Sequence, residues 1–246
     1  MQTLVLIRHG QSTWNQTNRF TGWVDVPLSE RGIQEACDSG KTLREAGHVF
    51  DVAFTSYLAR AIHTLDLVLE EMGSNSALVT RDWRLNERHY GSLQGLNKRE
   101  TANKFGEEQV LVWRRSFSVR PPELSHDDPS HPRNDPLYKD VPNLPNSESL
   151  ADTFIRIHEW WEDALKPSLL KGQKVLVVAH GNSLRALVKL MENLSEEKIL
   201  ALNIPTGIPI SYQLNGNLDV LSRRFLASED VVKAAVEEVF NQGSRK

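Results

Sequence analysis

The sequence has very little cysteine, with Cys37 as the single thiol among 246 residues. One cysteine can form neither an internal disulfide framework nor a zinc site built from several thiolates. Scarcity of this kind fits a reducing compartment, so we expect the chain in the cytoplasm.

Long apolar runs are also missing. No stretch approaches the roughly 20 consecutive apolar residues that a membrane-spanning helix needs. The N-terminus enters an apolar segment, residues 3–7, without the basic region and cleavage site of a signal peptide. We therefore expect no membrane association.

The chain carries little net charge, since 29 Lys and Arg against 32 Asp and Glu give −3. This balance provides no overall attraction to nucleic acid or to an anionic membrane, and we expect neither as a partner. An anionic substrate would have to be held by a local cluster of Arg and Lys. The length permits one large α/β domain or two small ones.

Short β-rich runs alternate with longer helical patterns, which is typical of an α/β fold with a mostly parallel central sheet and helices on both faces. Strands are expected over 3–8, 52–55 and 175–179, whose continuous apolar character suits burial on both sides. Helices are expected over 34–45, 59–72, an amphipathic stretch at 150–165, and 228–240. Residues 210–214 and 218–225 flank Asn215-Gly216-Asn217 and predict a hairpin.

Residues 116–147 differ from the rest because they hold seven of the eleven prolines and show no sustained periodicity. Proline blocks regular hydrogen bonding, so an irregular insert is expected there. We interpret this insert as a lid or rim over an active site, the alternative being a plain surface excursion. Residues 1–246 are taken as a single domain, with 241–246 as a flexible tail that could close over the site.

Two of the predicted strands end in nearly the same way. Residues 6–12 read LIRHGQS and residues 177–183 read VVAHGNS, so His9 and His180 each follow a buried strand and precede a Gly and a helix. Ligands of open parallel sheets bind beyond the carboxyl ends of strands, and glycine with a helix N-terminus favours an anion there. Two such histidines, 171 residues apart in the sequence, can face one phosphoryl-sized group.

A third strand end adds positive charge, because Arg60 follows the strand at 52–55 by five residues. Arg8 and Arg60 could surround a phosphoryl group together with the two histidines, as phosphoryl transfer requires. Arginine supplies forked donors that match phosphate geometry. Considered alone, an arginine at this position is more often a solvated helix residue.

These residues carry a family resemblance. Arg8-His9-Gly10 is the signature triplet of the histidine phosphatase superfamily, and LIRHGQSTWN extends it. The segments RFTGWVDVPLSERG, TSYLARAIHTL, LNERHYGSLQGLNK, WRRSF, PPEL and AHGNSLRALVK are similar, in order, to those of cofactor-dependent phosphoglycerate mutases. The resemblance covers almost the whole chain and implies a phosphoglycerate mutase-like fold.

The resemblance implies a role for each central residue. His9 would attack the phosphoryl group and become phosphohistidine, and His180 would donate to the group in transfer. Glu87 would be the general acid and base. Without the resemblance, an ion pair of Glu87 with Arg84 or Arg88 would be preferred.

The resemblance also implies a set of substrate-binding residues around this centre. They are Gly10, Gln11, Ser12, Asn15, Thr21, Gly22, Arg88, His89, Tyr90, Lys98, Arg114, Arg115, Gly181 and Asn182. The basic members suit a substrate with two phosphates, or with a phosphate and a carboxylate.

The implied reaction interconverts 2-phosphoglycerate and 3-phosphoglycerate, primed by 2,3-bisphosphoglycerate, in a homodimer or homotetramer. Hydrolysis of a small phosphorylated metabolite is the alternative, and a non-catalytic regulatory protein on the same scaffold is a second one. No metal is expected. The candidate cluster of His126, Asp127, Asp128, His131 and Asp135 is interpreted as solvated surface.

Overall fold

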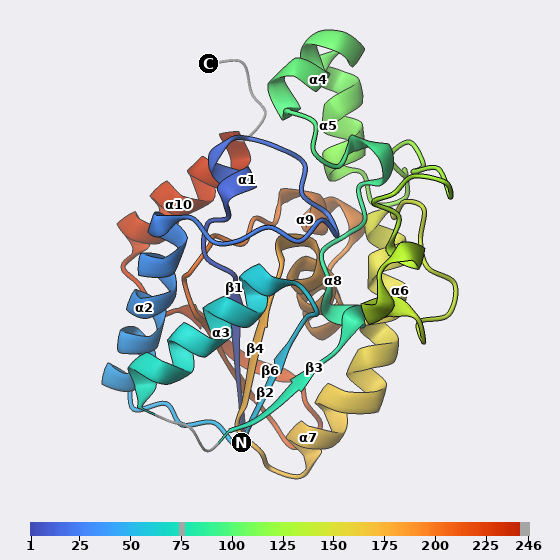
Figure 1. The fold of residues 1–246 in the computed structure, drawn as a ribbon. Coiled ribbons are helices and arrows are strands. Elements are labelled where there is room, and N and C mark those ends of the chain that lie inside the picture. Colours follow the sequence, from blue (N-terminus) through green and yellow to red (C-terminus); the bar gives the residue numbers. More distant parts are fainter. Residues whose placement is uncertain (74–76, 242–246) are drawn as a thin grey trace.

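A computed structural model describes residues 1–73 and 77–241 of the chain, and all but the first residue of the expected tail at 241–246 lies outside this range. In the described part, helices surround one twisted sheet (Figure 1). Its six strands are β1 (Gln2–Arg8), β2 (Val52–Thr55), β3 (Leu78–Arg81), β4 (Val175–Ala179), β5 (Ile210–Leu214) and β6 (Val220–Phe225). Their order is β3-β2-β4-β1-β5-β6; the first four are parallel, and β5 and β6 are antiparallel. The mostly parallel α/β sheet is confirmed.

Helices cover both faces of the sheet because its strands are apolar on both sides. In β1, Leu4 and Leu6 belong to a core shared with α6 (Leu150–Trp160) and α8 (Gly181–Glu192). The alternate residues Val5 and Ile7 face a second core, built with α2 (Glu30–Glu45) and α3 (Ala59–Met72). Successive strand residues point to opposite faces, so an unbroken apolar run requires both layers.

The remaining elements of the described residues are shorter or lie at the periphery. The helices are α1 (Thr13–Gln16), α4 (Lys98–Phe105), α5 (Glu107–Arg115), α7 (Lys166–Leu170), α9 (Glu196–Ala201) and α10 (Glu229–Asn241). Single 3₁₀ turns cover Trp83–Leu85, Gly91–Leu93, Pro132–Asn134 and Pro136–Tyr138, and a π-helical turn covers Trp161–Leu165. None of these helices is long and apolar enough to cross a membrane.

Some boundaries differ from the sequence-based expectation for local reasons. Helix α2 starts at Glu30 instead of 34 because the Ser29 hydroxyl caps it by accepting from the N–H of Gly32. The second hairpin strand starts at Val220 instead of 218 because Leu218 has a positive φ of 67° in the turn.

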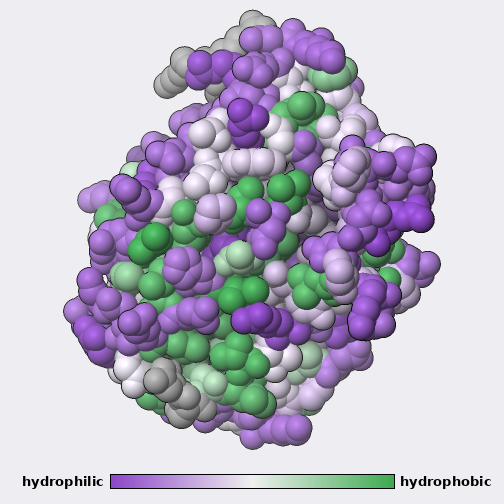
Figure 2. Space-filling view, viewed as in Figure 1, coloured by the Kyte–Doolittle hydropathy of each residue, from purple (hydrophilic) through white to green (hydrophobic). Residues whose placement is uncertain are grey.

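Several elements were not expected from the sequence, among them β3, α4 and α5. Strand β3 has only four residues, all exposed, and lies at the edge of the sheet. Figure 2 shows hydrophobic residues gathered on the lower part of this face, where the β3 edge lies, and Leu78 and Val79 are among the exposed apolar side chains. Helices α4 and α5 form a projection beyond the carboxyl ends of the parallel strands (Figure 1).

The insert at 116–147 is irregular apart from its two 3₁₀ turns, as expected. It is nevertheless anchored, since His131 and Tyr138 are buried. The Tyr138 hydroxyl accepts a hydrogen bond of 2.9 Å from the Asn86 side chain, and its ring stacks on Trp23 with centroids 5.0 Å apart. The insert therefore packs against the segment that precedes Glu87.

A close contact between two glycines fixes the segment that follows β1. A Cβ atom on Gly10 would lie 2.1 Å from the carbonyl oxygen of Gly32, and one on Gly32 would lie 2.0 Å from that of Gln11. These atoms are backbone and cannot move aside as a flexible side chain would. The first turn of α2 therefore packs directly against the residues that follow His9.

We predict that Gly32→Ala destabilises the protein by about 1–3 kcal/mol, the usual cost of forcing an extra carbon into a packed site. This cost outweighs the gain of about 1 kcal/mol that alanine brings to a helix. The free energy of unfolding in urea measures the change. The control Gly216→Ala places its Cβ in open space and should stay within about 0.5 kcal/mol of the parent; equal stability of both variants would contradict the packing argument.

Candidate active site

His9 lies at the carboxyl end of β1 with one ring nitrogen already engaged. Its Nδ1 is 2.7 Å from the carbonyl oxygen of Gly10. A carbonyl only accepts hydrogen bonds, so Nδ1 carries the proton and Nε2 keeps its lone pair. The backbone N–H of His9 donates to the carbonyl of Ala179 at 2.9 Å and thereby joins β1 to β4 at this edge.

His180 follows β4 and lies against His9, with ring centroids 4.9 Å apart and a tilt of 60°. Its Nε2 is 2.7 Å from the hydroxyl oxygen of Ser56 at the end of β2. Its buried Nδ1 has no hydrogen-bond partner within the described parts of the chain. The sequence-based expectation that the two imidazoles meet is thus fulfilled in the geometry.

Arg8 and Arg60 are buried beside the two rings and are held by backbone carbonyls. Nη1 of Arg8 donates to the carbonyl of Ile204 at 2.8 Å. Arg60 donates to the carbonyl of Gly22 at 2.7 Å and to that of Val24 at 3.1 Å. Neutral partners fix both guanidinium groups, and neither forms an ion pair with a described residue.

Burial and the neighbouring positive charge both affect the protonation of the two histidines. The pKa of His9 and the pKa of His180 both lie well below the ordinary value, chiefly because burial disfavours the imidazolium form and next because of the Arg60 cation. His9 is therefore neutral at physiological pH, and a neutral imidazole has the free lone pair that nucleophilic attack requires.

Glu87 faces the same space. Its carboxylate accepts from the backbone N–H of Arg88 at 2.7 Å and from that of Asn182 at 3.2 Å. A Cβ added to Gly181 would lie 3.5 Å from the Arg8 guanidinium carbon and 3.6 Å from Glu87 Oε2, so this glycine lies between the two groups.

The alternative ion pairs of Glu87 are not formed. Arg84 pairs with Asp82 and Asp163, each at 2.8 Å. The guanidinium of Arg88 lies over the ring of Tyr90, 4.6 Å from its centroid, and donates to the carbonyl of residue 114.

These residues surround a cavity of about 90 Å³ with a strong excess of positive charge. Among the described residues, its cationic lining consists of Arg8, Arg19, Arg60, Lys98, Arg114, Arg115 and Arg185. Glu87 is the single acidic side chain of that lining. Burial, and next the charge of Arg115, lowers the pKa of Arg114 to about 10 and that of Arg185 to about 9, so both stay charged at neutral pH. The charge of this lining favours a ligand with several negative charges.

Several buried polar atoms at the cavity have no partner in the part of the chain that the structure describes. They are the donors Arg8 Nε and Arg185 Nε and the acceptor Asn203 Oδ1. Because buried polar groups are normally hydrogen-bonded, unpaired donors in a cationic cavity fit an anionic ligand that completes their bonding.

Most of the expected site residues line this cavity. Besides Arg8, His9, Arg60 and Glu87, they are Asn15, Thr21, Gly22, Tyr90, Lys98, Arg114, Arg115, Gly181 and Asn182. His180 reaches the centre through its contact with the His9 ring.

Five expected binding residues are not part of the cavity lining: Gly10, Gln11, Ser12, Arg88 and His89. Gly10 packs against α2, and Ser12 caps α1. The His89 ring lies against Trp23, and burial lowers its pKa to about 3.

Six lining residues were missed: Arg19, Phe20, Arg185, Asn203, Ile204 and Val239. For Arg185 a signal existed, because it lies four residues after Gly181 and so on the same face of α8. It donates to the side-chain oxygen of Asn182 at 2.9 Å. Val239 comes from α10, and nothing in the sequence connects that helix to the site.

Comparisons with known proteins agree with this geometry. The model of the histidine phosphatase superfamily (branch 1) matches residues 4–127 and 123–212. A 2,3-bisphosphoglycerate-dependent phosphoglycerate mutase of Borreliella burgdorferi (strain ZS7) is 52% identical over the full length of both chains. The protein of the same name from Borreliella afzelii (strain PKo) is 52% identical over 99% of each.

Solved structures share the fold at lower identity. A putative alpha-ribazole-5'-P phosphatase from Escherichia coli is 23% identical with a TM-score of 0.68, over 92% of this chain and 96% of that one. A mycobacterial glucosyl-3-phosphoglycerate phosphatase is 23% identical with a TM-score of 0.67, over 93% and 99%. The fold, the site and these matches together establish that the chain belongs to the histidine phosphatase superfamily and, within it, to the family of 2,3-bisphosphoglycerate-dependent phosphoglycerate mutases.

Proposed function

We propose that this protein interconverts 2-phosphoglycerate and 3-phosphoglycerate through a phosphohistidine on His9, primed by 2,3-bisphosphoglycerate. The observation that carries the proposal is the neutral His9 ring in a cavity lined by seven cationic side chains and one carboxylate. One phosphoryl group does not require so much positive charge, whereas two phosphates, or a phosphate and a carboxylate, do. The name shared by the 52% identical relatives supports the same substrates.

In this proposal the lone pair on Nε2 of His9 attacks phosphorus. The N–P bond forms as the bond from phosphorus to the leaving oxygen breaks. Arg8, Arg60 and His180 neutralise charge on the equatorial oxygens, which is the main requirement of phosphoryl transfer. The hydrogen bond from Nδ1 to the Gly10 carbonyl keeps the attacking nitrogen unprotonated.

Glu87 acts as the general acid and the general base in this proposal. As an acid it protonates the leaving oxygen, and as a base it removes the proton from the hydroxyl that attacks phosphohistidine in the return step. The backbone N–H groups of Arg88 and Asn182 hold its carboxylate toward the cavity.

2,3-Bisphosphoglycerate, when bound, supplies the phosphoryl group that first loads His9. The unpaired donors of Arg8 and Arg185 and the cations of α5, Arg114 and Arg115, would hold its two phosphates and carboxylate. These side chains provide the charge neutralisation that metal ions provide in kinases, and the proposal includes no metal.

Hydrolysis of a phosphorylated metabolite is the second candidate, because the structural neighbours named above are phosphatases. The two reactions differ in the acceptor, which is a sugar-acid hydroxyl or water. The insert at 116–147 is interpreted as a lid or rim that would help exclude water. None of its residues lines the cavity, while Tyr138 within it contacts Asn86, next to Glu87.

We further propose a cytoplasmic homodimer or homotetramer. Strand β3 is an edge strand with exposed Leu78 and Val79. An exposed apolar edge of this kind is suited to pairing with another chain.

A coupled assay in EDTA tests the proposed reaction. We predict full mutase activity with 2,3-bisphosphoglycerate, a much lower rate without it, and an acid-labile, base-stable label on the wild-type chain that His9→Ala lacks. Rapid release of inorganic phosphate without an acceptor would favour the phosphatase, and activity that depends on added Mg²⁺ or Mn²⁺ would contradict the metal-free mechanism.

We predict that Glu87→Gln keeps the fold and lowers kcat for the mutase reaction by about 10²–10⁴, the usual contribution of a general acid or base. Gln retains the acceptor oxygen but cannot exchange the proton. Steady-state kinetics beside a thermal unfolding curve measure both properties, and an unchanged kcat would remove Glu87 from the mechanism.

We predict that Arg115→Ala raises KM for phosphoglycerate by roughly tenfold or more, the loss expected for a charged hydrogen bond. Transfer to His9 from a small artificial donor should change less. The exposed Arg224→Ala, on β6 and away from the cavity, is the charge-matched control. A larger loss with the small donor than with phosphoglycerate would contradict a role in substrate binding.

A further inference from the structure

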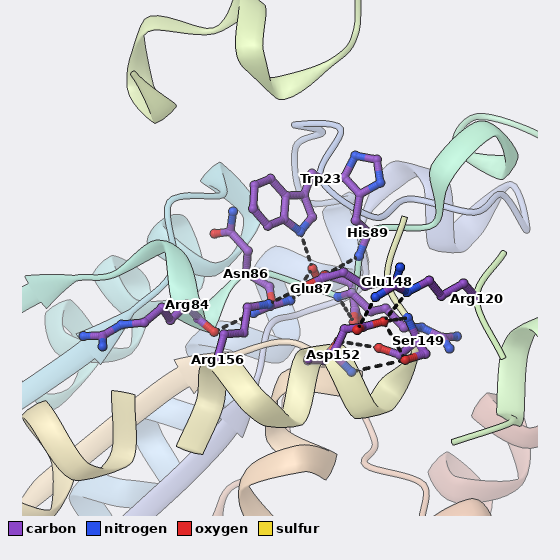
Figure 3. Close-up of polar contacts among 12 residues, drawn as sticks. Trp23, Arg84, Asn86, Glu87, His89, Arg120, Glu148, Ser149, Asp152 and Arg156 are labelled. Atoms are coloured by element: carbon purple, nitrogen blue, oxygen red, sulfur yellow. Dashed lines mark hydrogen bonds and ion pairs between the residues drawn. The ribbon is translucent and has the colours of Figure 1, made fainter. Parts of the chain in front are cut away.

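The backbone around Glu87 is held by hydrogen bonds from one buried side chain that does not line the cavity. Arg156, on α6, is 4% exposed, and all five of its N–H groups are used. Nη1 donates to the carbonyls of Arg84 and Asn86 at 2.5 and 2.9 Å, and Nη2 donates to that of Glu87 at 3.0 Å. The other bonds, from Nε at 2.7 Å and Nη2 at 2.9 Å, go to the two carboxylate oxygens of Glu148 (Figure 3).

Glu148 forms hydrogen bonds to the backbone on the other side of Glu87. Its carboxylate also accepts from the backbone N–H of His89 at 2.8 Å, and its own N–H donates to the carbonyl of His89 at 2.8 Å. The ion pair therefore holds the chain on both sides of Glu87, at residues 84–86 and at residue 89.

A third donor reaches the same point from another part of the fold. Trp23 Nε1 donates to the carbonyl oxygen of Glu87 at 2.6 Å, so this oxygen accepts from both Trp23 and Arg156 (Figure 3). With its carbonyl fixed by two donors and its carboxylate by two N–H groups, Glu87 is held at both ends.

We propose that Arg156, paired with Glu148, is a positioning residue for proton transfer, setting the Glu87 carboxylate at the distance that the reaction needs. The inference rests on the proposed role of Glu87. A planar guanidinium can reach three carbonyls and a carboxylate at once, whereas a lysine ammonium has three donors and no fixed plane. Displacement of a reacting group by about 1 Å can cost on the order of 10² in rate.

Arg156→Lys tests the proposal, because it keeps the buried charge but cannot make five bonds. We expect mutase kcat to fall by roughly tenfold or more, with KM changed by less than about threefold. Phosphorylation of His9 by p-nitrophenyl phosphate, whose leaving group needs little protonation, should fall far less. A purely structural role would lower both rates together, and equal losses would overturn the proposal.

The matched control is Arg120→Lys. Arg120 forms a similar two-bond pair with Asp152 of the same helix α6, at 2.7 and 2.6 Å, but it is exposed and does not contact the Glu87 segment (Figure 3). Its kcat should stay within about twofold of the parent, as expected for a surface pair. A loss equal to that of Arg156→Lys would overturn the proposal.

The double variant Arg156→Lys with Glu87→Gln separates this inference from the proposed function. If Arg156 acts through Glu87, kcat of the double variant should match that of Glu87→Gln alone. If the double variant instead loses kcat by the product of the two single losses, the inference is overturned and the role of Glu87 stands. An unchanged kcat in Glu87→Gln would overturn that role itself.

Trp23→Phe provides an independent variant should Arg156→Lys not fold. It removes one hydrogen bond to the Glu87 carbonyl and keeps an aromatic ring. We expect the same selective loss, in mutase kcat and not in transfer from p-nitrophenyl phosphate. If the folded variant loses both rates equally relative to the parent, the proposal is overturned.

Discussion

The site depends on positive charge that is buried and not neutralised by the protein itself. Burial of a charge without a partner is costly, and proteins usually pair it with a carboxylate. Here Arg8, Arg60 and Arg185 donate to main-chain carbonyls instead. A carbonyl satisfies an N–H geometrically without cancelling the charge. The guanidinium groups are thus fixed in place while their field remains available to an anion.

The sheet determines where that field acts. Strands β1 and β4 are parallel neighbours with Arg8 beside Ala179, so the next residue of each strand is a histidine at the same edge. Regular pairing therefore brings two residues that are 171 positions apart into ring contact. Burial first, and the charge of Arg60 next, lowers the pKa of both rings and keeps His9 neutral.

The central strands could be predicted because apolar runs buried on two faces leave a clear pattern, and the histidines could be predicted because their contexts match. Strand β3 could not, since its four residues are exposed and its existence depends on pairing with β2. Asn203 and Val239 reach the cavity only through the path of the backbone after α9 and through the docking of α10. The resemblance implies Arg88 and His89 as binding residues; local spacing does not show that Arg88 lies over the Tyr90 ring and His89 against Trp23. Long-range packing of this kind is not encoded in local spacing.

The position of β1 in the sheet also has a consequence for biosynthesis. Among the described strands β1 comes first in the sequence, yet its two neighbours, β4 and β5, are residues 175–179 and 210–214. The seven largely apolar residues of β1 therefore have no partner strand on either side until most of the chain has been translated. Folding with such distant contacts is slow and leaves apolar strands open to aggregation in the meantime. The arrangement that brings His9 to His180 thus leaves β1 without its partners until late in synthesis.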